Sequence, residues 1–87
     1  MKIIKIGALW CSGCLITNKA INQIKKEYSN IEIKELDVDF DEEECRLYHY
    51  EDILPVLIFE KENKEIKRLV GEISYEQLKN EIESSED

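Results

Sequence analysis

The chain has 87 residues, of which 37% are charged and 43% hydrophobic, and its formal net charge is −8. This balance predicts one globular domain over residues 1–87, with a modest core, rather than a disordered chain. The acidic excess disfavours nucleic acid and anionic membranes as partners, because both are bound through Lys and Arg, and it favours a monomer. No apolar run approaches the roughly 20 residues that span a bilayer.

The N-terminus and the cysteine count bear on the cellular compartment. Met1 to Lys5 carries two lysines and lacks the long apolar region of a signal peptide, so we expect a cytoplasmic protein. Three cysteines is an odd count, and structural disulfides are rare in the cytosol. In that compartment a Cys-x-x-Cys pair more often indicates catalysis or metal binding than cross-linking.

The first half of the chain predicts a strand, a helix and a second strand. Residues 2–8 are rich in isoleucine, as a buried strand is, and end in small residues that leave room beneath the following turn. Residues 12–28 have helical spacing, with Ser12 as the cap, and residues 31–38 form the second strand. The predicted apolar face of the helix consists of Ile16, Ala20, Ile21, Ile24 and Tyr28.

A short acidic helix is predicted over residues 42–50. Asp41 precedes it, and Glu44 stands where the partner in a capping box would be. The acidic run from residue 37 to residue 44 is expected to be a solvated face, because it lacks the glycine and the spacing of a calcium loop.

The last third of the chain predicts a hairpin and a helix. Strands over 55–59 and 66–70 flank a polar turn. Ser74 and Gln77 form a capping box before the helix, and residues 84–87 are expected to fray. The apolar stripe of this helix consists of Tyr75, Leu78 and Ile82. The whole order predicts an α/β fold whose four-stranded mixed sheet, with one parallel pair from a right-handed crossover, is flanked by three helices.

The stretch that carries chemistry is Trp10-Cys11-Ser12-Gly13-Cys14, between the first strand and the first helix. Cys11 would lie at the first amides of the helix, whose dipole favours a negatively charged sulfur. A thiolate is the form that attacks disulfides. Cys14, one turn into the helix, would close a disulfide with Cys11. We therefore interpret the stretch as a redox site.

The order of elements, the Trp-Cys-x-x-Cys motif and the proline that opens the third strand resemble the thioredoxin family over nearly the whole chain. In that family a cis-proline faces the active-site disulfide, and Leu54-Pro55 stands at its position. Gly71 matches the family's glycine after the last strand. The resemblance implies a minimal thioredoxin fold and a protein-disulfide reductase that cycles Cys11 and Cys14 between dithiol and disulfide. The substrate-binding residues that it implies are Trp10, Leu54, Pro55 and Gly71.

The resemblance also implies the partners. A reductase of the thioredoxin-reductase type would donate electrons, so the protein itself needs no cofactor, and disulfide-containing proteins would be the targets. Leu9 and Trp10 are expected to form an exposed apolar rim beside Cys11, which is typical of a docking surface.

The chain departs from the family at two places. Ser12-Gly13 replaces the usual Gly-Pro pair, so the family's redox potential does not carry over. Lys5 stands where the family buries an aspartate, and Glu35 stands where the family has the lysine that partners it. We hypothesise a buried pair with reversed charges, in which Glu35 transfers protons. The alternative is that both side chains extend to solvent.

Three other interpretations stay open at this stage. A glutaredoxin-like enzyme would use glutathione on the same fold, and a binding module would use the fold without redox chemistry. A zinc site would combine Cys11 and Cys14 with Cys45 and His49, which are spaced i, i+4. Otherwise Cys45 is a buried small hydrophobe or a regulatory thiol, and His49 is a surface residue.

Overall fold

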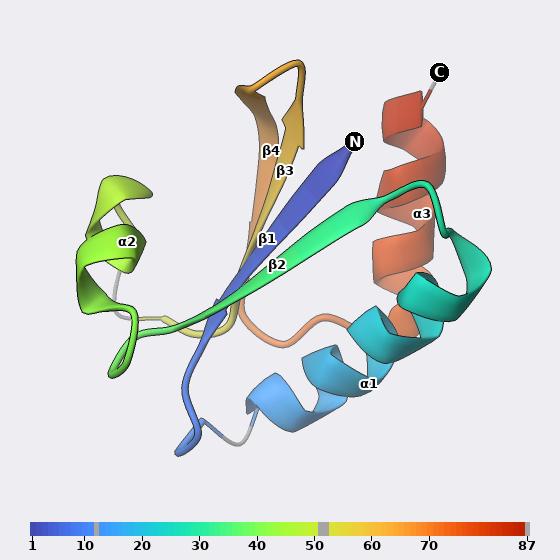
Figure 1. Cartoon of the computed structure of the whole chain (residues 1–87). Coiled ribbons are helices and arrows are strands. Elements are labelled where there is room, and N and C mark those ends of the chain that lie inside the picture. Colours follow the sequence, from blue (N-terminus) through green and yellow to red (C-terminus); the bar gives the residue numbers. More distant parts are fainter. Residues whose placement is uncertain (12, 51–52, 87) are drawn as a thin grey trace.

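The computed structural model describes residues 1–11, 13–50 and 53–86, and Figure 1 shows how its helices and strands are arranged. In these ranges no helix is both long enough and apolar enough to cross a membrane. The elements follow the predicted order: β1 (Lys2–Gly7), α1 (Gly13–Glu27), β2 (Glu32–Asp37), α2 (Glu42–Leu47), β3 (Val56–Lys61), β4 (Lys64–Val70) and α3 (Tyr75–Glu86).

The four strands form one mixed sheet in the order β2-β1-β3-β4. β1 and β2 are parallel, whereas β3 is antiparallel to both β1 and β4. Helices α1 and α3 lie together on one face of the sheet, and α2 lies on the other (Figure 1). The predicted fold is therefore confirmed, including the crossover pair and the hairpin.

The core consists of two apolar clusters, one on each face of the sheet. Successive side chains of a strand point to opposite faces, so the central strands β1 and β3 supply both clusters and are buried along most of their length. The cluster under α1 and α3 is built around Ile3, Ile21, Ile24, Leu57, Phe59, Leu78 and Ile82. The cluster under α2 consists of Ile4, Ile6, Leu36, Cys45, Val56 and Ile58.

The predicted apolar face of α1 is wrong at one position. Ile16 is 46% exposed, and the neighbouring Thr17 is fully buried in its place. The buried stripe runs through Cys14, Thr17, Ala20 and Ile24, so Ile16 projects sideways to solvent. Apolar spacing alone did not separate these neighbouring positions, because the hydroxyl of Thr17 finds its partners on another segment.

Helix α2 is shorter than predicted and is not held by a capping box. It ends at Leu47, and His49 follows in a left-handed conformation with φ of 52°. Asp41 occupies the N-cap position without a side-chain cap; its Oδ2 accepts a hydrogen bond from the backbone of Asp37 at 2.9 Å instead. Glu44 pairs with Lys34 of β2 rather than with the helix start.

The C-terminal third matches the predicted elements with longer strands and a longer helix. Glu62 and Asn63, both with positive φ, form the two-residue turn of the hairpin. The capping box is confirmed, since Gln77 Oε1 accepts from the backbone of Ser74 at 3.0 Å and Ser74 Oγ accepts from the backbone of Gln77 at 3.3 Å. The expected fraying is wrong for residues 84–86, which continue α3. Residue 87 lies outside the described part of the chain.

Candidate active site

The Cys-x-x-Cys stretch spans the end of a turn and the first residues of α1. The backbone N–H of Cys11 donates to Ala8 O, and that of Cys14 donates to Cys11 O, both at 3.2 Å. Cys11 is half-buried, whereas Cys14 is 2% exposed, and both are free thiols. The two thiols therefore differ in access to solvent. Ser12, the predicted cap and support residue, lies outside the described residues.

The environment of Cys14 keeps its sulfur protonated at neutral pH. Burial is the main cause that raises the pKa of this thiol, to about 11, and a hydrogen bond with the Cys11 side chain adds to it. A backbone hydrogen bond from Ala8 and the positive charge of Lys5 act in the opposite direction. Cys14 thus needs help to lose its proton.

Gly7 leaves the space into which the Cys14 sulfur fits. A Cβ atom at this position would lie 3.1 Å from Cys14 Sγ and 3.6 Å from Cε of Lys5. The first distance is tighter than ordinary van der Waals contact, so a side chain here would force the sulfur to move. This contact explains why a small residue, Gly7, lies beneath the turn.

Pro55 lies beside the start of α1. The Leu54-Pro55 peptide bond is cis. A Cβ on Gly13 would lie 3.8 Å from Pro55 Cδ, and the Pro55 carbonyl accepts a hydrogen bond of 2.8 Å from the backbone of Gly71. Gly71 has a φ of 96°, a region that favours glycine. The structure thus brings the segments before β3 and after β4 together at the Cys-x-x-Cys stretch.

Thr17 is a structural residue of the site that the sequence prediction missed. Its Oγ1 accepts a hydrogen bond from the backbone N–H of Ile73 at 3.1 Å and lies 3.4 Å from the Ile73 carbonyl. This contact fastens the second turn of α1 to the loop that follows Gly71. The position of a threonine within an apolar helical stripe could have predicted that its hydroxyl is buried and hydrogen-bonded.

The predicted ion pair between Lys5 and Glu35 is wrong. The two residues are opposite one another in the parallel ladder, as expected. However, Lys5 is 8% exposed and its Nζ donates to Asn18 Oδ1, whereas the Glu35 side chain is 43% exposed and lies 3.7 Å from Lys25 Nζ. Because β2 is an edge strand, Glu35 reaches the rim of the sheet, while Lys5 on central β1 is covered by α1.

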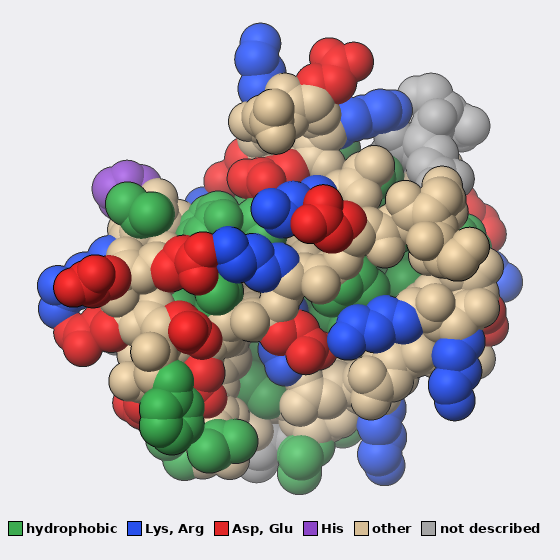
Figure 2. All heavy atoms as spheres, in the orientation of Figure 1, with side chains coloured by type: hydrophobic (Ala, Val, Ile, Leu, Met, Phe, Trp, Pro, Cys, Tyr) green, Lys and Arg blue, Asp and Glu red, His purple; other side chains and the backbone are tan. Residues whose placement is uncertain are grey.

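The segments next to Cys11 carry exposed apolar side chains, which we call the apolar rim. Leu9 and Trp10 are both strongly exposed, as predicted, and the indole N–H of Trp10 donates to Asp39 Oδ2 at 2.9 Å. Figure 2 shows apolar side chains gathered, with acidic ones nearby, at the end of the molecule where the loops after β1 and β2 lie. Further exposed hydrophobic residues of these loops and of the start of α1 are Leu15, Ile16 and Phe40.

The structure contradicts the zinc hypothesis. Cys45 is fully buried against Ile4 and Ile6, on the α2 face of the sheet, while Cys14 lies on the α1 face. His49 is exposed. In the described ranges, no three His, Cys, Asp or Glu side chains converge as metal ligands would. Burial raises the pKa of the Cys45 thiol, which fits the small-hydrophobe interpretation.

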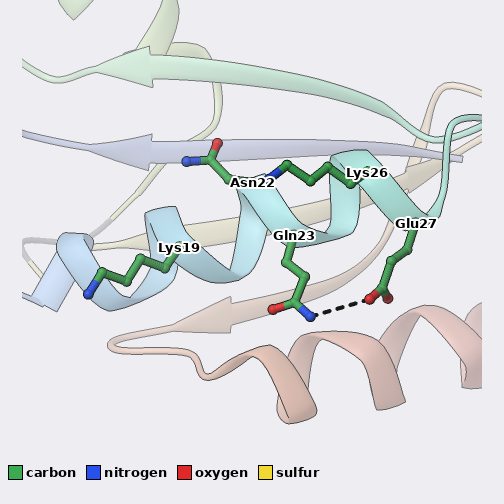
Figure 3. A pocket seen from close by; sticks show the side chains of 5 residues that line it. All are labelled: Lys19, Asn22, Gln23, Lys26 and Glu27. Carbon is green, nitrogen blue, oxygen red and sulfur yellow. Dashed lines mark hydrogen bonds between the residues drawn. The ribbon is translucent and has the colours of Figure 1, made fainter.

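A surface hollow on α1 contains none of the predicted site residues. It is lined by Lys19, Asn22, Gln23, Lys26 and Glu27, and Gln23 donates to Glu27 across it at 3.3 Å (Figure 3). All five residues belong to one stripe of α1, and neither cysteine of the Cys-x-x-Cys stretch is among them. The candidate site therefore stays at the start of α1.

Comparisons with known proteins identify the family and the fold of the chain. The family model for thioredoxin matches residues 1–84. Thioredoxin-2 of the malaria parasite, a component of its protein secretion machinery, superposes with a TM-score of 0.88 at 23% identity, over 95% of this chain and 81% of that chain. Fasciola hepatica thioredoxin superposes with a TM-score of 0.86 at 26% identity, over 95% and 78%. Oxidised mitochondrial thioredoxin 3 of Saccharomyces cerevisiae gives 0.84 at 18%, over 95% and 76%. A sequence search finds no match among curated proteins.

Proposed function

Because the chain belongs to the thioredoxin family, we propose that it is a thiol-disulfide oxidoreductase that reduces disulfides in target proteins. The observation that carries the proposal is the pairing of a half-buried Cys11 with a buried Cys14 at the start of α1, beside Pro55. A reactive thiol with a second thiol in reserve is what a dithiol-disulfide cycle requires.

In the first step, the thiolate of Cys11 attacks one sulfur of the target disulfide. A bond forms between Cys11 Sγ and that sulfur, the target disulfide breaks, and the other target sulfur leaves as a thiolate that takes a proton from solvent. The first backbone amides of α1 favour negative charge on the attacking sulfur, since they lack partners within the helix.

In the second step, Cys14 loses its proton and attacks Cys11 Sγ. The bond between Cys11 and Cys14 forms, the mixed disulfide breaks, and the second target sulfur leaves. Two electrons have then passed from the protein dithiol to the target. The raised pKa of Cys14 keeps this sulfur protonated until the mixed disulfide has formed, which separates the roles of the two cysteines.

The apolar rim and the Pro55 segment would bind the target. An extended target chain would pair with the backbone next to Pro55 as an added strand, and Trp10 would contact its side chains. Exposure of Leu9 and Trp10 supports this role, because apolar side chains on a surface mark docking sites. A reductase of the thioredoxin-reductase type would restore the dithiol, and a cytoplasmic location would keep that donor within reach.

Insulin-disulfide reduction with dithiothreitol tests the proposal. We expect the wild-type protein to accelerate precipitation of the insulin chains, and Cys11→Ser to abolish that acceleration. Cys45→Ala is the matched control, because Cys45 lies on the other face of the sheet, and it should retain the activity. A wild-type protein no faster than dithiothreitol alone would leave a binding module as the better interpretation. Regeneration by glutathione, but not by a thioredoxin reductase, would indicate a glutaredoxin-like enzyme.

A further inference from the structure

Lys5 is the one charged side chain among the buried residues of the described chain, and it lies beneath the resolving sulfur. Its Cε and the Cys14 Sγ lie 3.6 Å and 3.1 Å from the same point, the site where a Cβ of Gly7 would be. Because Gly7 has no side chain, both groups can approach this point. A positive charge near a sulfur favours its anion, because the protein interior screens charge weakly, and the charge of Lys5 acts on Cys14 in this direction.

Asn18 determines where this ammonium lies. It is one helical turn beyond Cys14 on α1, so both residues face the same part of β1. The Asn18 side-chain carbonyl accepts the hydrogen bond from Lys5 Nζ. A neutral acceptor satisfies the lysine and leaves its positive charge uncompensated, whereas a carboxylate at this position would cancel it.

The acidic residues near Lys5 sit across a cavity rather than in contact with it. Lys5 and Asn18 line a cavity of about 200 Å³ whose other polar walls are Glu35, Asp37 and Asp41. Glu35 is paired with Lys25, and Asp41 accepts a backbone hydrogen bond from Asp37. The cavity is large enough to admit water beside Lys5 and Asn18.

We propose that Lys5, held by Asn18, is a positioning residue that stabilises the thiolate of Cys14 in the resolving step. The inference rests on the proposed function, and it replaces the proton transfer that we had expected of Glu35 with stabilisation by the positive charge of Lys5. The Cys14 proton passes to solvent water, the electron pair left on Sγ forms the bond to Cys11 Sγ, and the mixed disulfide breaks as the target sulfur leaves. The direction in which Lys5 acts on the Cys14 pKa, downward, is consistent with this assignment.

The test measures the titration of Cys14 itself. In a Cys11→Ser/Cys45→Ala background, Cys14 is the remaining thiol, and its ionisation is followed by the pH dependence of its ¹³Cβ chemical shift in cysteine-labelled protein, which the ionisation of the four tyrosines does not obscure. We expect Lys5→Gln to shift the midpoint upward by roughly one pH unit, since an opposite charge at close range is lost. Lys5→Arg, which keeps the charge and cannot act as a base, should restore the parent midpoint.

Asn18 provides a second, independent arm. Asn18→Asp places a carboxylate against the ammonium and should also raise the midpoint of the Cys14 titration. Because Asn18 is half-buried whereas Lys5 is buried, this variant is expected to disturb folding less than Lys5→Gln. An unchanged midpoint in Lys5→Gln, or in Asn18→Asp should Lys5→Gln fail to fold by circular dichroism, would overturn the proposal. The titration needs no target protein. A wild-type chain that fails to reduce insulin would therefore count against the proposed function and not against this inference.

Discussion

Cys14 and Cys45 are both buried thiols, yet they lie on opposite faces of the sheet in different surroundings. Cys14 contacts the Cys11 side chain and the Ala8 backbone, with the Lys5 charge nearby, whereas Cys45 packs among apolar residues. The charges that act on Cys45 are acidic residues before and within α2, and they raise its pKa further. Burial alone therefore does not make a redox thiol. A partner sulfur and a favourable charge distinguish Cys14.

The largest expected effect separates the two cysteines by activity. Cys14→Ser should abolish repeated turnover of insulin when a thioredoxin reductase, and not dithiothreitol, supplies the electrons, because the mixed disulfide on Cys11 cannot be resolved within the protein. Cys45→Ser should turn over at nearly the wild-type rate, although a polar hydroxyl in the apolar cluster should lower the free energy of unfolding by about 1–3 kcal/mol. Turnover assays and urea unfolding measure the two quantities.

A trapped intermediate sharpens this prediction. Cys14→Ser incubated with an oxidised target should accumulate a mixed disulfide on Cys11 that mass spectrometry detects and dithiothreitol releases. Equal loss of turnover in Cys14→Ser and Cys45→Ser would remove the distinction between the two faces of the sheet.

The pH dependence of stability gives the second effect. The Cys14 pKa lies at about 11 in the folded protein against 9.0 for the ordinary thiol, so the folded state holds this proton more firmly. The stabilisation is complete below pH 9 and is lost as the pH rises toward 11. Its size is on the order of 2 kcal/mol.

Urea unfolding of the reduced protein at several pH values between 8 and 11 measures this loss. Cys14→Ala should show a shallower decline than the wild type over that interval. The decline should not vanish, because the pKa of Cys45 is also raised and acts with the same sign. Parallel curves for wild type and Cys14→Ala would contradict the prediction.

Gly7→Ala should lower the free energy of unfolding by an amount similar to, or smaller than, the pH effect, because it crowds Cys14 and does not affect Cys45. The new methyl group would lie 3.1 Å from Cys14 Sγ, and overpacking of this kind costs about 1–3 kcal/mol. Gly13→Ala is the matched control for stability, because its Cβ would meet Pro55 and Glu72 at an ordinary 3.8 Å. Thermal unfolding of both variants checks the contrast, and a Gly7→Ala protein as stable as Gly13→Ala would show that the sulfur moves freely.

The sequence predicted the features of the site that depend on chain order. Pro55 and Gly71 were assigned to the site before the structure, because the resemblance to the thioredoxin family implies a proline before the third strand and a glycine after the last one. The partner of Lys5 was not predicted, because it depends on how α1 lies across the sheet. That packing brings Asn18 over β1 and leaves Glu35 at the exposed edge. A long charged side chain can reach several possible partners, and the periodicity of the sequence does not predict which of them it contacts.

The sequence pattern also failed to predict where α2 ends and which residues of α1 face the core. Ile16 and Thr17 both fit an apolar helical stripe. Thr17 is the residue that faces inward, where its hydroxyl accepts a hydrogen bond from the backbone of Ile73. Helix α2 ends before the predicted residue 50, and His49 adopts a left-handed conformation there. The sequence has no glycine at this position that would have predicted the helix end. Where an asparagine or histidine takes the place that glycine usually fills, turn chemistry is hard to see from residue types.

The smallest expected effect on stability comes from Ile16, whose exposure the sequence did not predict. Ile16→Ser should change the free energy of unfolding by no more than about 0.5 kcal/mol, because the side chain already faces solvent. Ile21→Ser, one and a half turns further along the same helix and fully buried, should cost several times more. If the exposed residues at the start of α1 help to dock targets, Ile16→Ser should nevertheless raise KM for insulin with kcat unchanged, since it removes binding that is uniform along the reaction. A large loss of stability in Ile16→Ser would instead mean that this side chain belongs to the core, and the boundary drawn here between the buried stripe and the docking rim would have to move.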